Sequence, residues 1–281
     1  MLAIVGGTGL YELAGLSVER RIAEPTPFGA PSGEIVAGRL HGQPLLFLAR
    51  HGAGHRLLPH EVNYRANVFA LKRAGATLLL GVSAVGSLAL EAAPGDLAVA
   101  EQYVDWTRGR RESTFFGRGV AAHVSTARPV STALVDALEA AGARIGVALR
   151  RGLTYACVEG PRFGTQAESR LLRHAGCHLV GMTNVPEAFL AREAQLAYAT
   201  LALVTDYDCW LDDPTQHASV TGVFEHYAQT LATARRLLDA LLQRPLPEPE
   251  PEIRRALRDA IVTPEAALDA GQRAWLDVLR S

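Results

Sequence analysis

Two aspartates at the end of an apolar segment are the residues of this sequence best placed to do chemistry. Asp206 and Asp208 lie in the run TDYDCW (205–210), and residues two apart on a strand point to the same side. Two neighbouring carboxylates cannot both ionise freely, so we expect one to keep its proton to higher pH. The pair then offers a donor beside an acceptor, which matches the N7 and 6-amino edge of an adenine ring. A solvated turn after the strand is the alternative.

Three other apolar segments end in groups that bind anions. The first runs into residues 6–9, where backbone N–H groups and the Thr8 hydroxyl form a natural anion site. The second ends in Arg50 and His51, and a guanidinium suits a pair of phosphate oxygens. The third ends in Val82–Ser87, whose small residues let amides and a hydroxyl approach an anion closely. Alone, each is consistent with a glycine turn or a surface ion pair. Together, without a Walker lysine, they indicate inorganic phosphate as a reactant.

The remaining composition excludes several classes of function. The nine histidines show no HExxH or similar spacing, and GxGxxG fails because position 12 is Glu12, so we expect no metal and no cofactor. The chain has 28 basic and 29 acidic residues, a net charge of -1, which gives no global field for nucleic acid or an anionic membrane. Lys72 is the only lysine, and we expect it at the surface.

The cysteines and the N-terminus predict a cytoplasmic protein. Cys157, Cys177 and Cys209 form no CxxC pair, which favours a reducing compartment over disulfides or structural zinc. The N-terminus shows no basic region followed by a cleavable apolar segment, and no apolar run approaches the roughly 20 residues of a membrane helix.

Short apolar strands alternate with helical patterns through most of the chain. This alternation predicts an α/β fold, a single domain with a central, mostly parallel, twisted mixed sheet flanked by helices. The predicted strands are 2–5, 44–49, 77–82, 96–100, 180–182 and 198–205. The predicted helices are 61–74, 131–141, 166–175, 186–195 and 220–243. Ligands of such folds bind at the carboxyl ends of the strands, where the groups described above lie.

A proline-rich segment separates this domain from a C-terminal tail. Residues 244–252 alternate proline with acid and predict an extended linker between a domain at 1–243 and a helical tail at 253–281. We expect tail helices at 253–261 and 264–279, the second with Thr263-Pro264 as its start signal. Such an amphipathic tail is expected to dock on its own body or on a neighbouring subunit, and a disordered tail is the alternative.

Eight short motifs resemble those of a known enzyme family. Together they are highly specific, although each is modest alone, and they fall in one register over roughly residues 1 to 240. The family is that of the trimeric purine nucleoside phosphorylases, and the chain is most similar to the members that cleave 5'-methylthioadenosine. The motifs are GGTGL (6–10), TPFGAPS (26–32), LARHG (48–52), HEVNYRAN (60–67), SAVGSL (83–88), VEGPRF (158–163), GMTNVPE (181–187) and TDYDCW (205–210).

The resemblance implies a role for each matching residue. The implied phosphate site consists of Thr8, Arg50, His51, Ser83, Ala84 and Thr183. The implied nucleoside site consists of Phe163 and Gly164 beside the base, Met182 at the ribose, Val220, Val223 and Phe224 around the 5'-methylthio group, and Asp206 and Asp208 at N7 and the 6-amino group. His123 matches a residue that an adjacent subunit contributes, so the resemblance also implies a homotrimer with sites at subunit interfaces.

The reaction implied by the resemblance is phosphorolysis of 5'-methylthioadenosine to adenine and 5-methylthioribose 1-phosphate. Asp206 is the expected general acid at N7, and inorganic phosphate is the co-substrate. One residue departs from the pattern, because Gly164 stands where these enzymes generally carry serine. Phosphorolysis of 5'-methylthioinosine or other 6-oxopurine nucleosides on the same fold therefore stays open. A non-catalytic purine-binding sensor is a further alternative, although a sensor has no need of a phosphate site.

Overall fold

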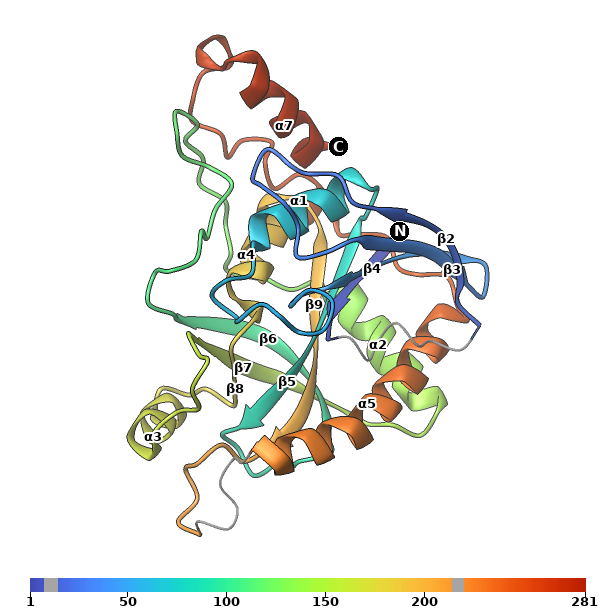
Figure 1. Ribbon diagram of the computed structural model, residues 1–281, viewed down its shortest axis with the longest axis vertical. Coiled ribbons are helices and arrows are strands. Elements are labelled where there is room, and N and C mark those ends of the chain that lie inside the picture. The colour runs from blue at the N-terminus through green and yellow to red at the C-terminus, as the bar shows by residue number, and fades with distance from the viewer. Residues whose placement is uncertain (8–14, 214–219) are drawn as a thin grey trace.

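The computed structural model describes residues 1–7, 15–213 and 220–281, with the backbone alone for residues 220–225. Its described part contains a nine-stranded sheet with helices on both sides (Figure 1). The strands are β1 Leu2–Gly6, β2 Ser17–Ile22, β3 Ile35–Leu40, β4 Gln43–Ala49, β5 Leu78–Ser87, β6 Leu97–Trp106, β7 Leu149–Val158, β8 Leu179–Gly181 and β9 Ala197–Asp206. The helices are α1 Tyr64–Arg73, α2 Thr132–Arg144, α3 Gln166–His174, α4 Asn184–Glu193, α5 Val220–Leu242, α6 Pro251–Arg254 and α7 Ala270–Arg280, with a 3-10 turn at Glu265–Ala267.

The sheet is mixed, and part of it closes on itself. Strands β4, β1, β5 and β9 run parallel to one another, and β3 and β2 extend the sheet in antiparallel fashion beyond β4. β5 also pairs with β8, after which β7, β6 and β9 follow and lead back to β5. Five of the nine described strand pairings are parallel, so the predicted mixed, mostly parallel sheet is confirmed by a narrow margin.

Both faces of the central strands are buried. In β1, Leu2 and Ile4 pack into a core with α2 and α5, whereas Ala3 and Val5 pack into a second core with α1, α4 and α7 (Figure 1). This is the two-residue period of a strand covered on both sides. Each fully buried aliphatic side chain of this kind contributes about 1.5–3 kcal/mol, so the strands that carry the site are rigidly held.

The linker and the first tail helix differ from the prediction. The extended segment ends at Glu250, whose carboxylate accepts hydrogen bonds from Ser131 Oγ at 2.8 Å and from the Ala133 N–H at 2.9 Å at the start of α2. Helix 253–261 is wrong: helical geometry covers only α6, at Pro251–Arg254. The Leu257 N–H instead donates to the Gln195 side chain at 3.1 Å, so a tertiary contact replaces the helical hydrogen bond.

The second tail helix begins later than predicted and packs on the body. The expected helix 264–279 is divided into the short 3-10 turn and α7. A capping box sets the start of α7, because Asp269 Oδ1 accepts the Gln272 N–H at 2.7 Å and Gln272 Oε1 accepts the Asp269 N–H at 2.9 Å. Leu276 and Leu279 are fully buried in the core with α1 and α4, so the tail docks on its own body.

The single lysine is not at the surface. Lys72 is only 5% exposed, and its Nζ donates to the carbonyl oxygen of Ser281 at 2.6 Å. Burial, together with the nearby charge of Arg254, lowers the pKa of Lys72 to about 8. The expected surface position is therefore wrong, because this amine holds the end of α7 against α1.

Candidate active site

A cavity of about 550 Å³ lies where β1, β4, β5 and β9 end, which is within the ~300–1,000 Å³ range of small-molecule sites. Residues that follow β1 and β4 line it together with residues of β5 and β9. Ten of the residues singled out in the sequence line this cavity: Arg50, His51, Ser83, Ala84, Phe163, Gly164, Met182, Thr183, Asp206 and Asp208. Strand ends far apart in the sequence thus bring their polar groups to one place.

The other predicted residues lie elsewhere or outside the described structure. Thr8 and the side chains of Val220, Val223 and Phe224 are outside the described residues. His123 is exposed and does not line the cavity; its N–H donates to the Ala260 carbonyl oxygen at 2.9 Å, which joins the His123 segment to the tail. Within the described ranges, no cluster of three or more His, Cys, Asp or Glu residues could hold a metal ion.

Arg50 is buried and forms an ion pair with Glu187. Its Nε and Nη2 groups donate to the two carboxylate oxygens at 2.8 and 2.9 Å. Nη1 also donates to the Val82 carbonyl oxygen at 3.0 Å, and Nη2 to that of Val5 at 3.1 Å. Burial alone would lower the pKa of Arg50, but the Glu187 carboxylate outweighs it and raises the pKa. Since a guanidinium has five N–H groups, these contacts account for four of them, and the fifth is on Nη1.

A chain of hydrogen bonds continues from Glu187 to the serine of the cavity wall. Tyr198 OH donates to Glu187 Oε1 at 3.0 Å and accepts from Asn184 Nδ2 at 2.8 Å. Ser83 Oγ in turn donates to Asn184 Oδ1 at 2.9 Å. Every member of this network is buried, so water does not compete for its hydrogen bonds. The network therefore fixes Ser83 and Arg50 in one rigid framework.

His51 brings a hydrogen-bond acceptor to the cavity and no charge at neutral pH. Its Nδ1 lies 2.8 Å from the Leu57 carbonyl oxygen, so Nδ1 carries the hydrogen and Nε2 keeps its lone pair. Burial, and then the positive charge of Arg50, lower the pKa of His51 to about 4. The ring also stacks on His55 with the ring centroids 4.3 Å apart.

The two aspartates face the same cavity, but not as alternate residues of one strand. β9 ends at Asp206, and Asp208 follows in a turn with a left-handed φ of 52°. The strand-alternation argument is therefore wrong, because the second aspartate lies beyond the strand. Asp206 Oδ1 accepts the Asp208 N–H at 2.7 Å, and this bond closes the turn that directs both side chains to the cavity.

Asp206 favours a proton mainly because it is buried. Desolvation is the largest cause of its raised pKa, and the negative charge of Asp208 makes a smaller contribution in the same direction. The Thr205 hydroxyl opposes both, since it lies 2.6 Å from Oδ2 and donates to the ionised carboxylate. That hydroxyl also lies 3.2 Å from the Val85 carbonyl oxygen, and its one hydrogen serves one acceptor at a time. A protonated Oδ2 can donate to Thr205 while Thr205 donates to Val85, so both protonation states are accommodated.

A buried arginine holds the loop that carries two predicted site residues. Arg111 Nη1 donates to the carbonyl oxygens of Met182 and Val185, both at 2.7 Å, and its Nε donates to Glu159 at 3.1 Å. Thr183 lies between these two anchored carbonyls, at the N-terminus of α4, and its hydroxyl does not cap the helix. The neighbours of Thr183 therefore fix its backbone at the cavity wall.

The residues that support the site were not predicted from the sequence. Asn184 and Glu187 lie within the motif GMTNVPE, so a signal was present, but no spacing shows that Glu187 pairs with Arg50, 137 positions earlier. Arg111 follows two other arginines in the stretch 108–111, and nothing in the sequence distinguishes the buried one from its exposed neighbours.

This chain is similar to known proteins over nearly its whole length. The S-methyl-5'-thioadenosine phosphorylase of Geobacter sulfurreducens is 46% identical over 279 residues, which covers 99% of this chain and 97% of that protein. The crystal structure of a methylthioadenosine phosphorylase from an antarctic soil metagenomic library superposes with a TM-score of 0.90 at 41% identity, covering 99% of this chain and 98% of that one. Methylthioadenosine phosphorylase from Schistosoma mansoni in complex with adenine gives a TM-score of 0.82 at 34% identity, covering 86% and 90%. The profile of the phosphorylase superfamily matches residues 1–243, and the chain belongs to that superfamily.

Proposed function

We propose that this protein is an enzyme that cleaves 5'-methylthioadenosine with inorganic phosphate, giving adenine and 5-methylthioribose 1-phosphate. The observation that carries the proposal is the meeting of Asp206 and Asp208 with Arg50, Ser83 and Thr183 in one cavity of about 550 Å³. This reaction needs both carboxylates that bind the edge of adenine and groups that bind an anion. Relatives that cover nearly the whole chain are named for the same activity.

Phosphate is the nucleophile of the proposed reaction. The Thr183 hydroxyl, the Ser83–Ala84 segment and the remaining Nη1 hydrogen of Arg50 hold it next to the ribose, which replaces a bimolecular encounter by a positioned one. The neutral His51 accepts the hydrogen of a monohydrogen phosphate through Nε2. A phosphate oxygen then forms a bond to C1' while the bond from C1' to N9 breaks and its electron pair passes to the purine.

Asp206 supplies the proton that the departing base needs. Burial raises the pKa of Asp206 and so favours its protonated form, which is the form that serves as general acid at N7. Asp208 accepts a hydrogen bond from the 6-amino group. A 6-oxopurine presents an acceptor there, so the pair disfavours hypoxanthine, as sites with mismatched buried polar groups strongly do.

The proposed assembly is a homotrimer with sites at subunit interfaces. His123 is exposed on the segment that runs beside the tail, where a neighbouring subunit can receive it. Val220, Val223 and Phe224 are the proposed apolar lining for the 5'-methylthio group. The proposed location is the cytoplasm, in keeping with three free cysteines. Among the described residues, no helix is long and apolar enough to cross a membrane.

The test is a product assay with two substrates. Purified protein is mixed with 5'-methylthioadenosine or 5'-methylthioinosine, with and without phosphate, and the free base is followed by chromatography. We expect adenine release that requires phosphate and far exceeds hypoxanthine release. Preferential hypoxanthine release would show that the aspartates do not select the base as argued. Binding of the nucleosides without release of free base would favour the alternative of a non-catalytic purine-binding sensor.

A further inference from the structure

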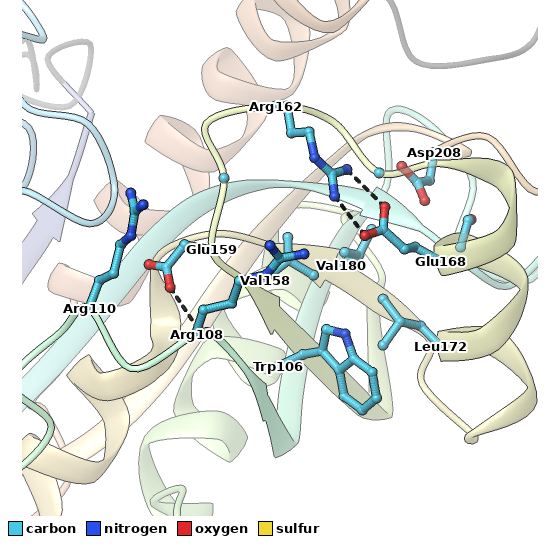
Figure 2. Close-up of a pocket in the computed structure, with 13 residues that line it drawn as sticks. Trp106, Arg108, Arg110, Val158, Glu159, Arg162, Glu168, Leu172, Val180 and Asp208 are labelled. Atoms are coloured by element: carbon cyan, nitrogen blue, oxygen red, sulfur yellow. Dashed lines mark hydrogen bonds and ion pairs between the residues drawn. The ribbon is translucent and has the colours of Figure 1, made fainter.

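A second, smaller cavity adjoins the proposed base site. Its volume is about 180 Å³, below the ~300–1,000 Å³ of complete small-molecule sites, so it suits a substituent better than a second nucleoside. Trp106 and Leu172 lie at one end and Asp208 at the other (Figure 2). Trp106 is 48% exposed, which leaves much of its indole available for contact.

Four residues line both cavities: Val158, Gly164, Val180 and Asp208. Gly164 is the only one of the four without a side chain, so the wall is thinnest there. The backbone does not require this glycine, since its φ is not in the left-handed region. A Cβ added at Gly164 would meet only the Asp208 carboxylate oxygens, at 3.7 and 4.0 Å, which are ordinary van der Waals contacts. The missing side chain therefore leaves room beside Asp208 that neither packing nor backbone geometry demands.

The wall of the second cavity also includes one buried hydroxyl, that of Ser169. Ser169 is 1% exposed, and its Oγ forms a weak hydrogen bond with the Cys209 thiol and has no nitrogen or oxygen partner among the described residues. Among the charged groups around the cavity, Arg162 donates to Glu168 at 2.7 and 2.8 Å, as Figure 2 shows, and Glu159 accepts from Arg111 at 3.1 Å. Arg108 and Arg110 also line it, with exposed side chains. A thiol is a weak hydrogen-bond partner, so a ligand group with an oxygen or nitrogen atom can improve the hydrogen bonding of this hydroxyl.

We propose that this cavity is a subsite for a substituent on the 6-amino nitrogen of an adenine nucleoside, admitted by Gly164. The proposal rests on the proposed function, in which Asp208 accepts a hydrogen bond from the 6-amino group. A singly substituted amine keeps one N–H for Asp208 and directs its other group past Gly164. The walls formed by Trp106, Leu172 and the two valines suit an aromatic or short apolar group, and Ser169 can bind a hydroxyl on it.

The activity test compares 5'-methylthioadenosine with its N6-benzyl derivative. For the wild type we expect kcat/KM values within about tenfold of each other, because one apolar group in a fitting pocket changes the barrier by only ~1–3 kcal/mol. Gly164→Val should lower the ratio of benzyl to unsubstituted kcat/KM at least tenfold. Trp106→Ala, at the far end, should lower the benzyl value alone. Cleavage of the unsubstituted nucleoside without cleavage of the benzyl one would overturn the subsite, as would an unchanged ratio in both variants.

A binding measurement separates this proposal from the proposed function. Calorimetry with adenine and N6-benzyladenine needs no turnover, so it tests the subsite even if 5'-methylthioadenosine is not cleaved. The wild type should bind the benzyl base at least as tightly as adenine, and Trp106→Ala should weaken only the benzyl base. Weaker binding of the benzyl base by the wild type, or equal effects of Trp106→Ala on both bases, would refute the subsite.

Discussion

Replacing Glu187 by Gln tests whether the buried ion pair with Arg50 holds the site together. Both side chains are 2% exposed, so removing the carboxylate charge leaves a buried guanidinium without compensation. A glutamine of the same shape accepts one Arg50 N–H through its oxygen, while its NH₂ group opposes the other. Breaking a buried pair in this way costs about 3–5 kcal/mol of unfolding free energy. For a chain of this size, at roughly 2–4 °C per kcal/mol, the Tm should fall by about 10 °C.

Added phosphate should partly reverse this loss. In the variant, the charge of Arg50 is no longer balanced by Glu187, so an anion bound beside it gains attraction. Thermal unfolding is followed at one protomer concentration, with and without phosphate, because a ligand that binds only the folded state raises the Tm. The rise in Tm on adding phosphate should be larger for Glu187→Gln than for the wild type.

The matched control is an exposed ion pair. Glu139 lies 2.8 Å from Arg151 and its side chain is 52% exposed, so Glu139→Gln should cost only about 0–1 kcal/mol. A Tm for Glu187→Gln as close to the wild type as that of the control would refute the reasoning that burial makes this pair essential. An equal phosphate response in the two glutamine variants would refute the electrostatic link between Glu187 and the phosphate site.

Three further outcomes are expected. Asp206→Ala should lower kcat by about 10²–10⁴, the usual contribution of a general acid, while the exposed Asp212→Ala changes it little; equal kcat values would remove Asp206 from the chemistry. Activity should fall as pH rises through the raised pKa of Asp206, and Thr205→Val, which removes a bond to the ionised form, should move that fall to higher pH in a pH–rate profile. Burial raises the pKa of Glu193 from 4.5 to about 7, so the folded state binds the extra proton and loses stability as pH rises between these values. Glu193→Gln should therefore gain stability over the wild type by about 1–3 kcal/mol at pH 8, measured by denaturant unfolding, and should show no such gain at pH 5.

The strands and helices that the sequence revealed are those with one strong local signal. The run before Asp206 is mostly apolar, and β9 is buried along nearly its whole length, so a buried strand was predictable. β2 and β7 were missed because they carry exposed charged residues on a mixed background, and β3 because Gly38 and Arg39 interrupt its apolar run. Their pairing partners, not their own composition, make them strands.

The site residues divide in a similar way. Residues at or just after the ends of strands, such as Asp206 and Arg50, were predictable because the carboxyl ends of parallel strands meet at one edge. Their partners were not, since the pairing of Arg50 with Glu187 depends on how α4 packs against β5 and β9. The cause of the raised pKa of Asp206 was also misjudged, because burial can be measured only once the fold is known.

The buried partners of the site residues change the net charge that the site offers to phosphate. From the sequence, Arg50 is expected to be an unpaired cation available to phosphate. In the structure, Glu187 already balances its charge, and His51 is neutral. In the proposed reaction, the described part of the cavity therefore leaves much of the phosphate charge uncompensated in the ground state. As the bond to N9 breaks, the ribosyl centre becomes positively charged and balances the part of the phosphate charge that the protein leaves unbalanced. The attraction is thus strongest in the transition state, and only interactions of that kind accelerate the chemical step.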